Sequence, residues 1–176
     1  MKLMIEKEKL NFRQATYEDL DHVLQLLQQA AKWLQTKNTT QWDYYIHDLD
    51  GNKAEVIESI ENGTTYIVEK EGKVIASVTL EDSPNEWDCD IWGDKAHDSD
   101  VVYLHRIVVH RDLKGRNIGE TLMEWAKGYV KEQQKKYVRF DCLASNKGLN
   151  DYYQRNYELV GIASIYGQHS KYQISV

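Results

Sequence analysis

The chain has 176 residues, 41% hydrophobic and 28% charged, with a formal net charge of −6 at pH 7. This length and composition predict a single domain over residues 1–176 with a full-sized core, and the acidic balance argues against a nucleic-acid partner. No apolar run approaches the length of a membrane span and the N-terminus lacks a signal-peptide core, so we expect a cytoplasmic protein with no membrane partner.

The remaining composition excludes several kinds of catalytic site. The two cysteines, Cys89 and Cys142, form no CxxC pair, and two thiols in a chain without a signal peptide suggest a reducing compartment. The six histidines include no HExxH motif, so we expect no metal site. A GxSxG elbow for a serine nucleophile is also missing.

The first half of the chain predicts a strand, two helices and a hairpin. A strand over 10–15 precedes Thr16, a good helix N-cap. The helix over about 17–35 would bury the stripe Leu20, Val23, Leu24, Leu27, Ala31 and Leu34. A second helix covers about 52–62 and ends at Gly63. Strands 65–70 and 73–80 flank Glu71-Gly72, a hairpin turn signal.

Two connecting segments have unusual compositions. Residues 33–45 are rich in aromatics, including Trp33 and Trp42, which predicts either a satellite core patch or the wall of a ligand cleft; composition alone favours the core patch.

Residues 81–100 hold eight acidic residues and one lysine. We interpret them as a long solvated β-hairpin loop, since charge blocks are usually hydrated surface. The alternative is an acidic rim that attracts a cationic substrate.

Residues 101–125 predict a buried strand, a basic loop and an amphipathic helix. The strand covers Val101 to Val109, and the helix begins near Ile118. A helix N-terminus carries unpaired N–H groups and partial positive charge, so this arrangement favours phosphate. An ordinary turn with surface cations explains the loop equally well. The spacing is neither a P-loop nor the GxGxxG dinucleotide motif.

The last third predicts a strand over 137–143, a short helix over 146–157, and two closing strands over 158–166 and 171–176. The full order is β-α-α-β-β-β-α-β-α-β-β. That order indicates an α/β (α+β) fold with helices on both sides of a sheet.

The loop and helix start resemble those of acyl-CoA-dependent N-acetyltransferases of the GNAT superfamily. That family places Gln/Arg-x-x-Gly-x-Gly/Ala after its central strand, and here the six positions are Lys114, Gly115, Arg116, Asn117, Ile118 and Gly119. Asn117 replaces the first glycine, and Asn is the residue other than glycine that best tolerates positive φ. The resemblance covers the whole element order. It implies a mixed, mostly antiparallel sheet of six or seven strands with helices on both faces.

A second signature of the family lies in the short helix. Asn146, Leu149, Tyr153 and Arg155 occupy the Asn, Ala, Tyr and Lys positions of Asn-x-x-Ala-x-x-x-Tyr-x-Lys. The Gly-Phe that usually follows is replaced by Asn156-Tyr157, as though one residue were missing. By this resemblance Tyr153 is the general acid that protonates the departing thiolate.

The resemblance also implies a set of binding residues. Acetyl-CoA would be the acyl-donor cosubstrate, with its pantetheine arm along Ile107, Val108 and Val109, its pyrophosphate on the backbone amides from Lys114 to Gly119, and Asn146 near the pantetheine. Trp33 and Trp42 would lie on the acceptor side of the cleft. The general base is open: His105 in the central strand, Glu81 at the end of the preceding strand, and a water chain all compete.

The leading hypothesis is transfer of an acetyl group from acetyl-CoA to a primary amine by direct attack in a ternary complex. The acidic segment favours a small cationic acceptor, such as a polyamine, an aminoglycoside or an amino-acid derivative, and a protein N-terminus or lysine side chain is the alternative acceptor. The rival is a non-catalytic CoA-binding or interaction module that keeps the fold, and a third option is another acyl-CoA donor. Tryptophans in polar segments leave a homodimer open.

Overall fold

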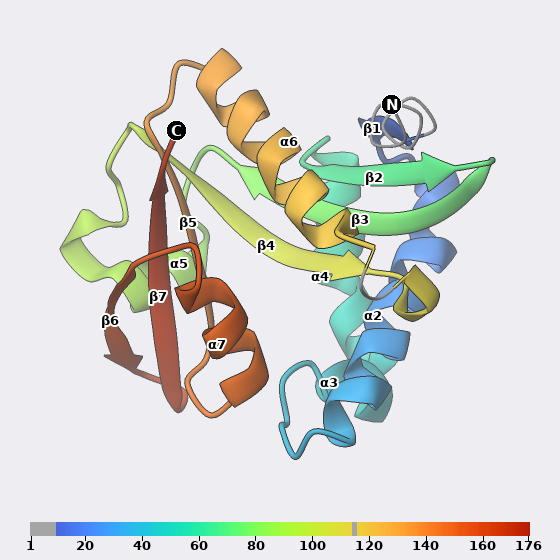
Figure 1. Ribbon diagram of the computed structural model, residues 1–176, viewed down its shortest axis with the longest axis horizontal. Helices are drawn as coiled ribbons and strands as arrows, with labels where there is room; N and C mark the ends of the chain where they lie inside the picture. The colour runs from blue at the N-terminus through green and yellow to red at the C-terminus, as the bar shows by residue number, and fades with distance from the viewer. Residues whose placement is uncertain (1–9, 114–115) are drawn as a thin grey trace. The chain divides into compact units, whose positions relative to one another are not determined.

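The computed structural model describes residues 10–113 and 116–176 (Figure 1). The chain divides into two compact units. Unit 1 consists of the chain up to Thr79 together with Arg106–Leu122, and unit 2 consists of Leu80–His105 and Met123–Val176. Each unit is therefore built from two separate stretches of sequence. That they act as the single domain expected from the sequence stays a prediction.

The described residues form a seven-stranded sheet in the order β1-β2-β3-β4-β5-β7-β6, mixed and mostly antiparallel as the resemblance implied. The strands are β1 (Leu10–Gln14), β2 (Thr65–Lys70), β3 (Lys73–Glu81), β4 (Val101–Val109), β5 (Tyr137–Leu143), β6 (Leu159–Ser164) and β7 (Gln168–Ser175).

In unit 1, β1, β2 and β3 pair antiparallel, and the turn at Glu71 and Gly72 has positive φ at both residues, 53° and 77°. Such a turn matches the twist of its flanking strands, so the predicted hairpin is confirmed. Thr16 begins the helical segment as predicted, in a capping box with Asp19. The helices of this unit are α2 (Leu20–Gln35), α3 (Tyr44–His47) and α4 (Leu49–Glu61).

The core of unit 1 is built on α2, whose predicted buried stripe is buried at every position. The stripe packs with Tyr45 of α3, Val56 and Ile60 of α4, Ile67 of β2 and Val108 of β4. A helix face of this width fixes α2 against its neighbours by burial of apolar surface. Gly63, at φ +72, ends the region of α4 as predicted.

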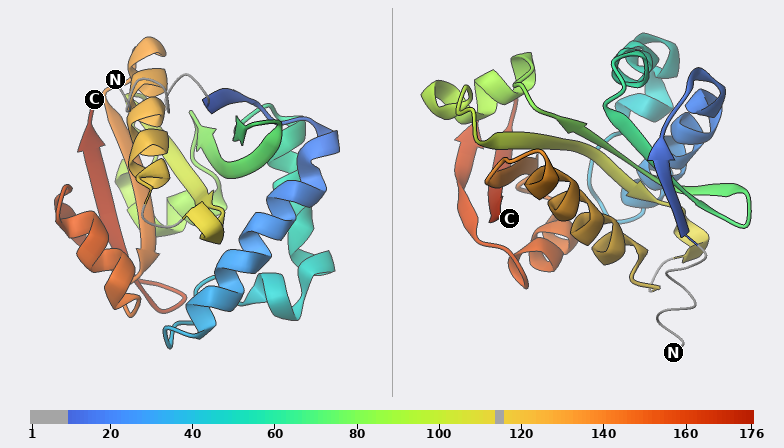
Figure 2. Two further views of the ribbon diagram at one scale, coloured as in Figure 1. Left: turned by 45° about the vertical axis from the view of Figure 1, so that its right-hand side comes forward. Right: turned by 90° about the horizontal axis from the view of Figure 1, so that it is seen from above.

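In unit 2, β7 pairs antiparallel with β5 along its length and with β6 on its other side (Figure 2). The parallel pairing of β4 with β5 runs from Val101–Tyr137 to Tyr103–Arg139. The helix α7 (Lys147–Gln154) contributes Tyr153 to a ring cluster with Phe140, Tyr157 and Tyr172.

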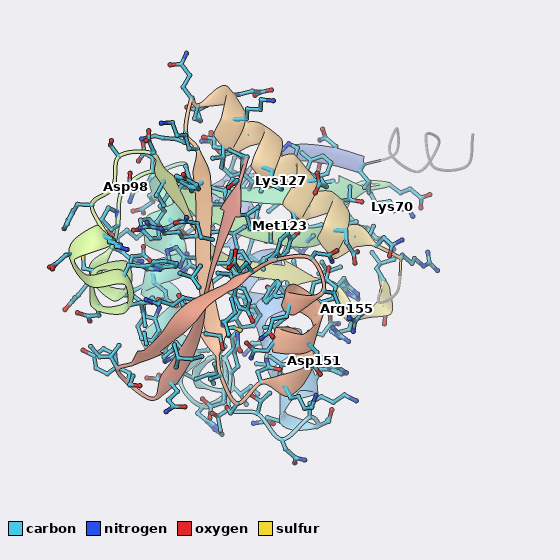
Figure 3. All side chains as sticks on the ribbon, turned by 60° about the vertical axis from the view of Figure 1, so that its left-hand side comes forward. Lys70, Asp98, Met123, Lys127, Asp151 and Arg155 are labelled. Carbon is cyan, nitrogen blue, oxygen red and sulfur yellow. The ribbon has the colours of Figure 1, made fainter. Side chains whose placement is uncertain are left out.

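The acidic segment 81–100 differs from the solvated loop that its charge predicted. It holds a helix, α5 (Glu86–Trp92), followed by a 3₁₀ turn and by a loop in which Asp98 is labelled in Figure 3. Ile91, Trp92 and Ala96 are buried with Val101 and Tyr103. The apolar residues among the acids therefore supply core contacts, and of the acids of α5 Glu86 is exposed whereas Asp88 is buried with the apolar side.

The structure also bears on the expected homodimer and on the expected absence of a membrane span. Trp92 is buried and the other tryptophans are partly buried, so exposed tryptophans no longer argue for a homodimer. Within the described ranges, none of the helices combines the length and the apolar character that crossing a membrane requires.

Candidate functional site

The residue before α6 (Ile118–Glu132) takes the positive φ that its place at a glycine position of the family motif would need. Asn117 lies at φ +57, in the left-handed region that glycine usually occupies. Its carbonyl oxygen accepts hydrogen bonds from the backbone N of Thr121 at 3.0 Å and from Thr121 Oγ1 at 2.9 Å. Asn117 thus begins the helix, as predicted. Lys114 and Gly115 lie outside the described residues.

The start of α6 fits an anionic group such as the pyrophosphate of acetyl-CoA. The first N–H groups of a helix have no acceptor within the helix and lie at the positive end of its dipole. Here they belong to Ile118 and Gly119, and Gly119 adds no side chain. Arg116 is exposed beside them. These residues could hold a phosphate group; the individual assignments stay predictions.

An unusual backbone conformation lies in the middle of β4, where Arg106 has φ +51. Its guanidinium donates to Ser59 Oγ at 2.9 Å and to Thr79 Oγ1 at 3.3 Å, which holds the residue in place. A left-handed residue interrupts the regular alternation of a strand and re-aims the N–H of the next residue, Ile107. Nothing in the sequence indicated this, because arginine has no preference for positive φ.

Trp33 and Trp42 were expected on the acceptor side of the cleft. Both side chains make packing contacts within unit 1. The Arg111 guanidinium lies 3.6 Å from the centre of the Trp33 ring, and the Arg111 backbone N donates to Gln29 Oε1 at 2.9 Å. Trp33 therefore ties the turn after β4 to α2. Trp42 packs against the core and meets Tyr45 edge-on at 6.5 Å. Contact of either ring with a substrate stays a prediction.

In unit 2, the two residues considered as alternative bases lie together. His105 Nε2 is 3.0 Å from Asp88 Oδ2, and Glu81, Asp88 and His105 place their side-chain N or O atoms within 4.8 Å of one another. Asp88 is 1% exposed and comes from α5. We call these three residues the proton-transfer cluster. Two carboxylates and an imidazole are also a donor set that could hold a divalent cation.

Asp88 was missed by the sequence interpretation, although a local signal was present. It is the third residue of α5, where its backbone N donates to Asn85 Oδ1 at 2.8 Å and its own Oδ2 accepts from the backbone N of Asn85 at 3.1 Å. This reciprocal capping box could have marked Asn85–Asp88 as a helix start. Because the charges of this segment were interpreted as hydrated surface, the helix start was not predicted.

The geometry of the cluster pairs one nitrogen of His105 with a carboxylate. Asp88 Oδ2 accepts the backbone N–H of Asn85 and lies 3.0 Å from His105 Nε2. Because a carboxylate can only accept, the tautomer of His105 that fits this contact carries its hydrogen on Nε2. A carboxylate that fixes the tautomer and orientation of an imidazole suits it to act as a base.

A second buried carboxylate, Asp141 of β5, lies near the cluster. Trp87 Nε1 donates to both its oxygens, at 3.1 and 3.2 Å, and His169 Nδ1 is 3.6 Å from Oδ2. Burial raises the pKa of Asp141, and the hydrogen bond from Trp87 and the charge of His105 oppose that rise. Asp141 and Trp87 were not among the predicted site residues.

Tyr153, the predicted general acid, is buried on α7, the helix in which Asp151 is labelled in Figure 3. Its hydroxyl makes no hydrogen bond to the described part of the chain, whereas the neighbouring Tyr172 donates to Asn150 Oδ1 at 2.7 Å. Burial raises the pKa of the Tyr153 phenol above its ordinary value of 10. The phenol thus stays protonated at neutral pH.

Asn146 has a structural function that the sequence did not assign. Its side-chain oxygen accepts the backbone N–H of Leu149 at 3.2 Å and so caps α7. This cap sets the position at which the helix carrying Tyr153 begins. Its contact with a pantetheine arm stays a prediction.

Comparison with known proteins agrees with the element order. The acetyltransferase (GNAT) family matches residues 25–158. The chain is 34% identical over 153 residues to the "Uncharacterized N-acetyltransferase YesJ" of Bacillus subtilis, covering 84% of this chain and 81% of that protein.

Solved structures of the same fold are found as well. A GNAT-family acetyltransferase from Listeria monocytogenes has a TM-score of 0.78 and 29% identity, over 95% of each chain. A PaiA N-acetyltransferase from Thermoplasma acidophilum, solved in complex with coenzyme A, has a TM-score of 0.70 and 15% identity, over 95% of this chain and 99% of its own. The chain therefore belongs to the GNAT acetyltransferase family and is an acetyl-CoA-dependent acyltransferase.

Proposed function

We propose that this enzyme transfers the acetyl group of acetyl-CoA to the primary amine of a small cationic molecule, by direct attack in a ternary complex. The observation that carries the proposal is the hydrogen bond of 3.0 Å between His105 Nε2 and the buried Asp88 carboxylate. This pair supplies the positioned base that an amine acceptor needs, because a primary amine is protonated and unreactive at neutral pH.

On the donor side, acetyl-CoA supplies the thioester that the amine attacks. Backbone N–H groups at the start of α6 would hold its pyrophosphate, with Arg116 adding charge. Asn117 at φ +57 supports this role, since it gives the turn the shape of a glycine-containing loop. The backbone of Ile107, Val108 and Val109 would bind the pantetheine arm. The N–H that follows Arg106 would stabilise the thioester oxygen as it gains negative charge.

On the acceptor side, each member of the proton-transfer cluster has one task. The His105 imidazole takes the proton of the incoming ammonium, and Asp88 keeps the imidazole in place. Glu81 draws the cationic amine toward the imidazole by Coulomb attraction. Because Asp88 touches His105 and not the reacting amine, it is a positioning residue.

After the N–C bond has formed, the C–S bond breaks and Tyr153 donates a proton to the departing thiolate, while the proton that the attacking nitrogen still carries returns to the phenolate. A phenol with a raised pKa is a weak acid, so proton transfer to a thiolate of ordinary pKa near 8.5 runs uphill. The hydroxyl therefore acts first as a hydrogen-bond donor that stabilises the thiolate, and the rate gain depends on its position.

The preference for a cationic acceptor comes from the charge of residues 81–100. That segment carries eight carboxylates and a single lysine, and it contributes both Glu81 and Asp88 to the cluster. A field of one sign near a site raises the local concentration of substrates of the opposite sign.

The test is thiol release from acetyl-CoA with a panel of amines that differ in charge. We expect turnover with small diamines and amino-acid amides, with kcat/KM at least about tenfold above that of neutral amines of equal size. The difference should shrink as salt is added, because screening weakens attraction over about 10 Å at 0.1 M. Equal rates for neutral and cationic amines would contradict the acceptor class, and absence of turnover with every amine would contradict amine acetylation.

A further inference from the structure

The outer side of α5 carries two carboxylates one helical turn apart, Glu86 and Asp90. Neither forms an ion pair or hydrogen bond with another described residue, and Glu86 is exposed. Like charges four residues apart on a helix repel and weaken it. Glu86 is in the first turn of α5, where the helix dipole favours a carboxylate, and Asp90 lies beyond that turn.

An aromatic pair lies beside these carboxylates. The rings of Trp87 and Tyr166 stack with centroids 5.8 Å apart and planes 20° apart. Tyr166 is 70% exposed, and its φ of +51 is a conformation that a tyrosine rarely adopts. His169 Nε2 lies 3.2 Å from the Tyr166 carbonyl oxygen and helps to hold this turn between β6 and β7.

Contacts with other residues of unit 2 hold the Trp87 side chain in place. Its Nε1 donates to both oxygens of Asp141, and the His169 ring meets it edge-on with centroids 4.8 Å apart. The indole therefore cannot turn away without breaking hydrogen bonds to a buried carboxylate. A partly exposed aromatic ring held this rigidly is already organised for a ligand.

Glu86, Trp87, Asp90 and Tyr166 together line a shallow hollow of about 400 Å³, which we call the acid–aromatic groove. We propose that the acid–aromatic groove is a second binding site, for a small alkylammonium cation. An ammonium group is attracted by the face of an aromatic ring and by carboxylates, and the groove supplies both. Apolar carbons of such a cation would lie along the stacked rings.

This groove is distinct from the proton-transfer cluster, although both use α5. Successive residues of a helix are rotated by about 100°, so Asp88 points about 200° away from Glu86, toward the interior. Asp88 is 1% exposed, whereas Glu86 is exposed. A cation in the groove therefore lies on the opposite side of the helix from the carboxylate that holds His105.

The test measures equilibrium binding of 1,4-diaminobutane to the full chain by calorimetry, without acetyl-CoA. We expect saturable binding that the double variant Glu86→Gln/Asp90→Asn weakens at least tenfold. The matched control is Asp82→Asn/Asp94→Asn, which removes the same charge from exposed positions of the same segment and should change affinity less than threefold. Tyr166→Ala should also weaken binding, and Tyr166→Phe should preserve it.

Three results would overturn the proposal. They are the absence of saturable binding at millimolar probe, equal losses in the two double variants, and a loss caused by Glu81→Gln but not by Glu86→Gln/Asp90→Asn. The second result would indicate a diffuse acidic field, and the third would indicate binding at the acceptor site only. 1,4-Butanediol, which has no charge, should not bind. The experiment measures binding without the acyl donor. A failure of amine acetylation would therefore not contradict cation binding at the acid–aromatic groove.

Discussion

The turn before α6 and the proton-transfer cluster differ in which atoms of the chain carry their chemistry. The turn offers backbone N–H groups, and its shape depends on Asn117 at φ +57. The cluster offers side-chain atoms, with the Asp88 carboxylate 3.0 Å from His105 Nε2. A site made of backbone tolerates most substitutions that keep its conformation, whereas a site made of side chains loses its function when one atom is replaced. Substitution should therefore separate the two regions clearly.

The largest effect is expected in the cluster. His105→Gln should lower kcat by about 10²- to 10³-fold, because it removes the proposed base. Asp88→Asn should lower kcat by about 10- to 100-fold, since an amide can present N–H to Nε2 and favour the wrong tautomer. The measurement is steady-state thiol release with a cationic amine, across pH.

A double variant distinguishes positioning from simple loss of structure. If Asp88 acts through His105, then His105→Gln/Asp88→Asn should be no slower than His105→Gln alone, because groups that act as a unit are not additive. Asp94→Asn is the matched control, an exposed carboxylate of the same acidic segment that belongs to neither proposed site, and should leave kcat within about twofold. Additive losses, or equal losses in Asp94→Asn, would contradict the proposed pair.

The two regions also differ in how far the sequence predicted them. The strands at Val101–Val109 and Tyr137–Leu143 follow from local composition and are confirmed. The positive φ of Asn117 agrees with its place at a glycine position of the family loop that it resembles. Asp88 meets His105 only because α5 forms within a segment whose charges suggested a loop. That meeting depends on contacts made by Ile91 and Trp92 with β4 residues, which no local pattern encodes.

Arg106 shows the same limit for the backbone. Its φ of +51 is stabilised by hydrogen bonds to Ser59 and Thr79, distant in sequence by 47 and 27 residues. Propensity predicts an ordinary strand residue there, and tertiary contacts override it. Backbone conformation was therefore predictable where one residue decides it alone, as at Asn117, and unpredictable where partners decide it.

A smaller effect is expected at Tyr153. Tyr153→Phe should lower kcat by about 10²-fold, the low end for a general acid, because a phenol with a raised pKa already donates weakly. The raised pKa has a second consequence. The phenol stays protonated beyond pH 10, so wild-type activity should show no alkaline decline due to Tyr153 below that pH. Rate–pH profiles of both proteins measure this.

Tyr172→Phe supplies the matched control for Tyr153. It removes another buried hydroxyl from the same ring cluster, one that donates to Asn150 Oδ1 at 2.7 Å. We expect a loss of about 1 kcal/mol in the free energy of unfolding, with kcat within about twofold. If both variants lose activity equally, packing of the cluster and not the Tyr153 hydroxyl explains the loss.

The smallest effect is expected at Asn117, because substitution there should change only the stability of the backbone conformation. Asn117→Ala should raise the Kd for coenzyme A about fivefold, because a residue with a Cβ and no compensating polar group pays about 1 kcal/mol to hold positive φ. Asn117→Gly should keep the Kd within about twofold, although it removes the whole side chain. Calorimetric titration with coenzyme A measures both. If glycine weakens binding as much as alanine does, the Asn117 side chain itself contacts the ligand, and the turn is not a purely backbone site.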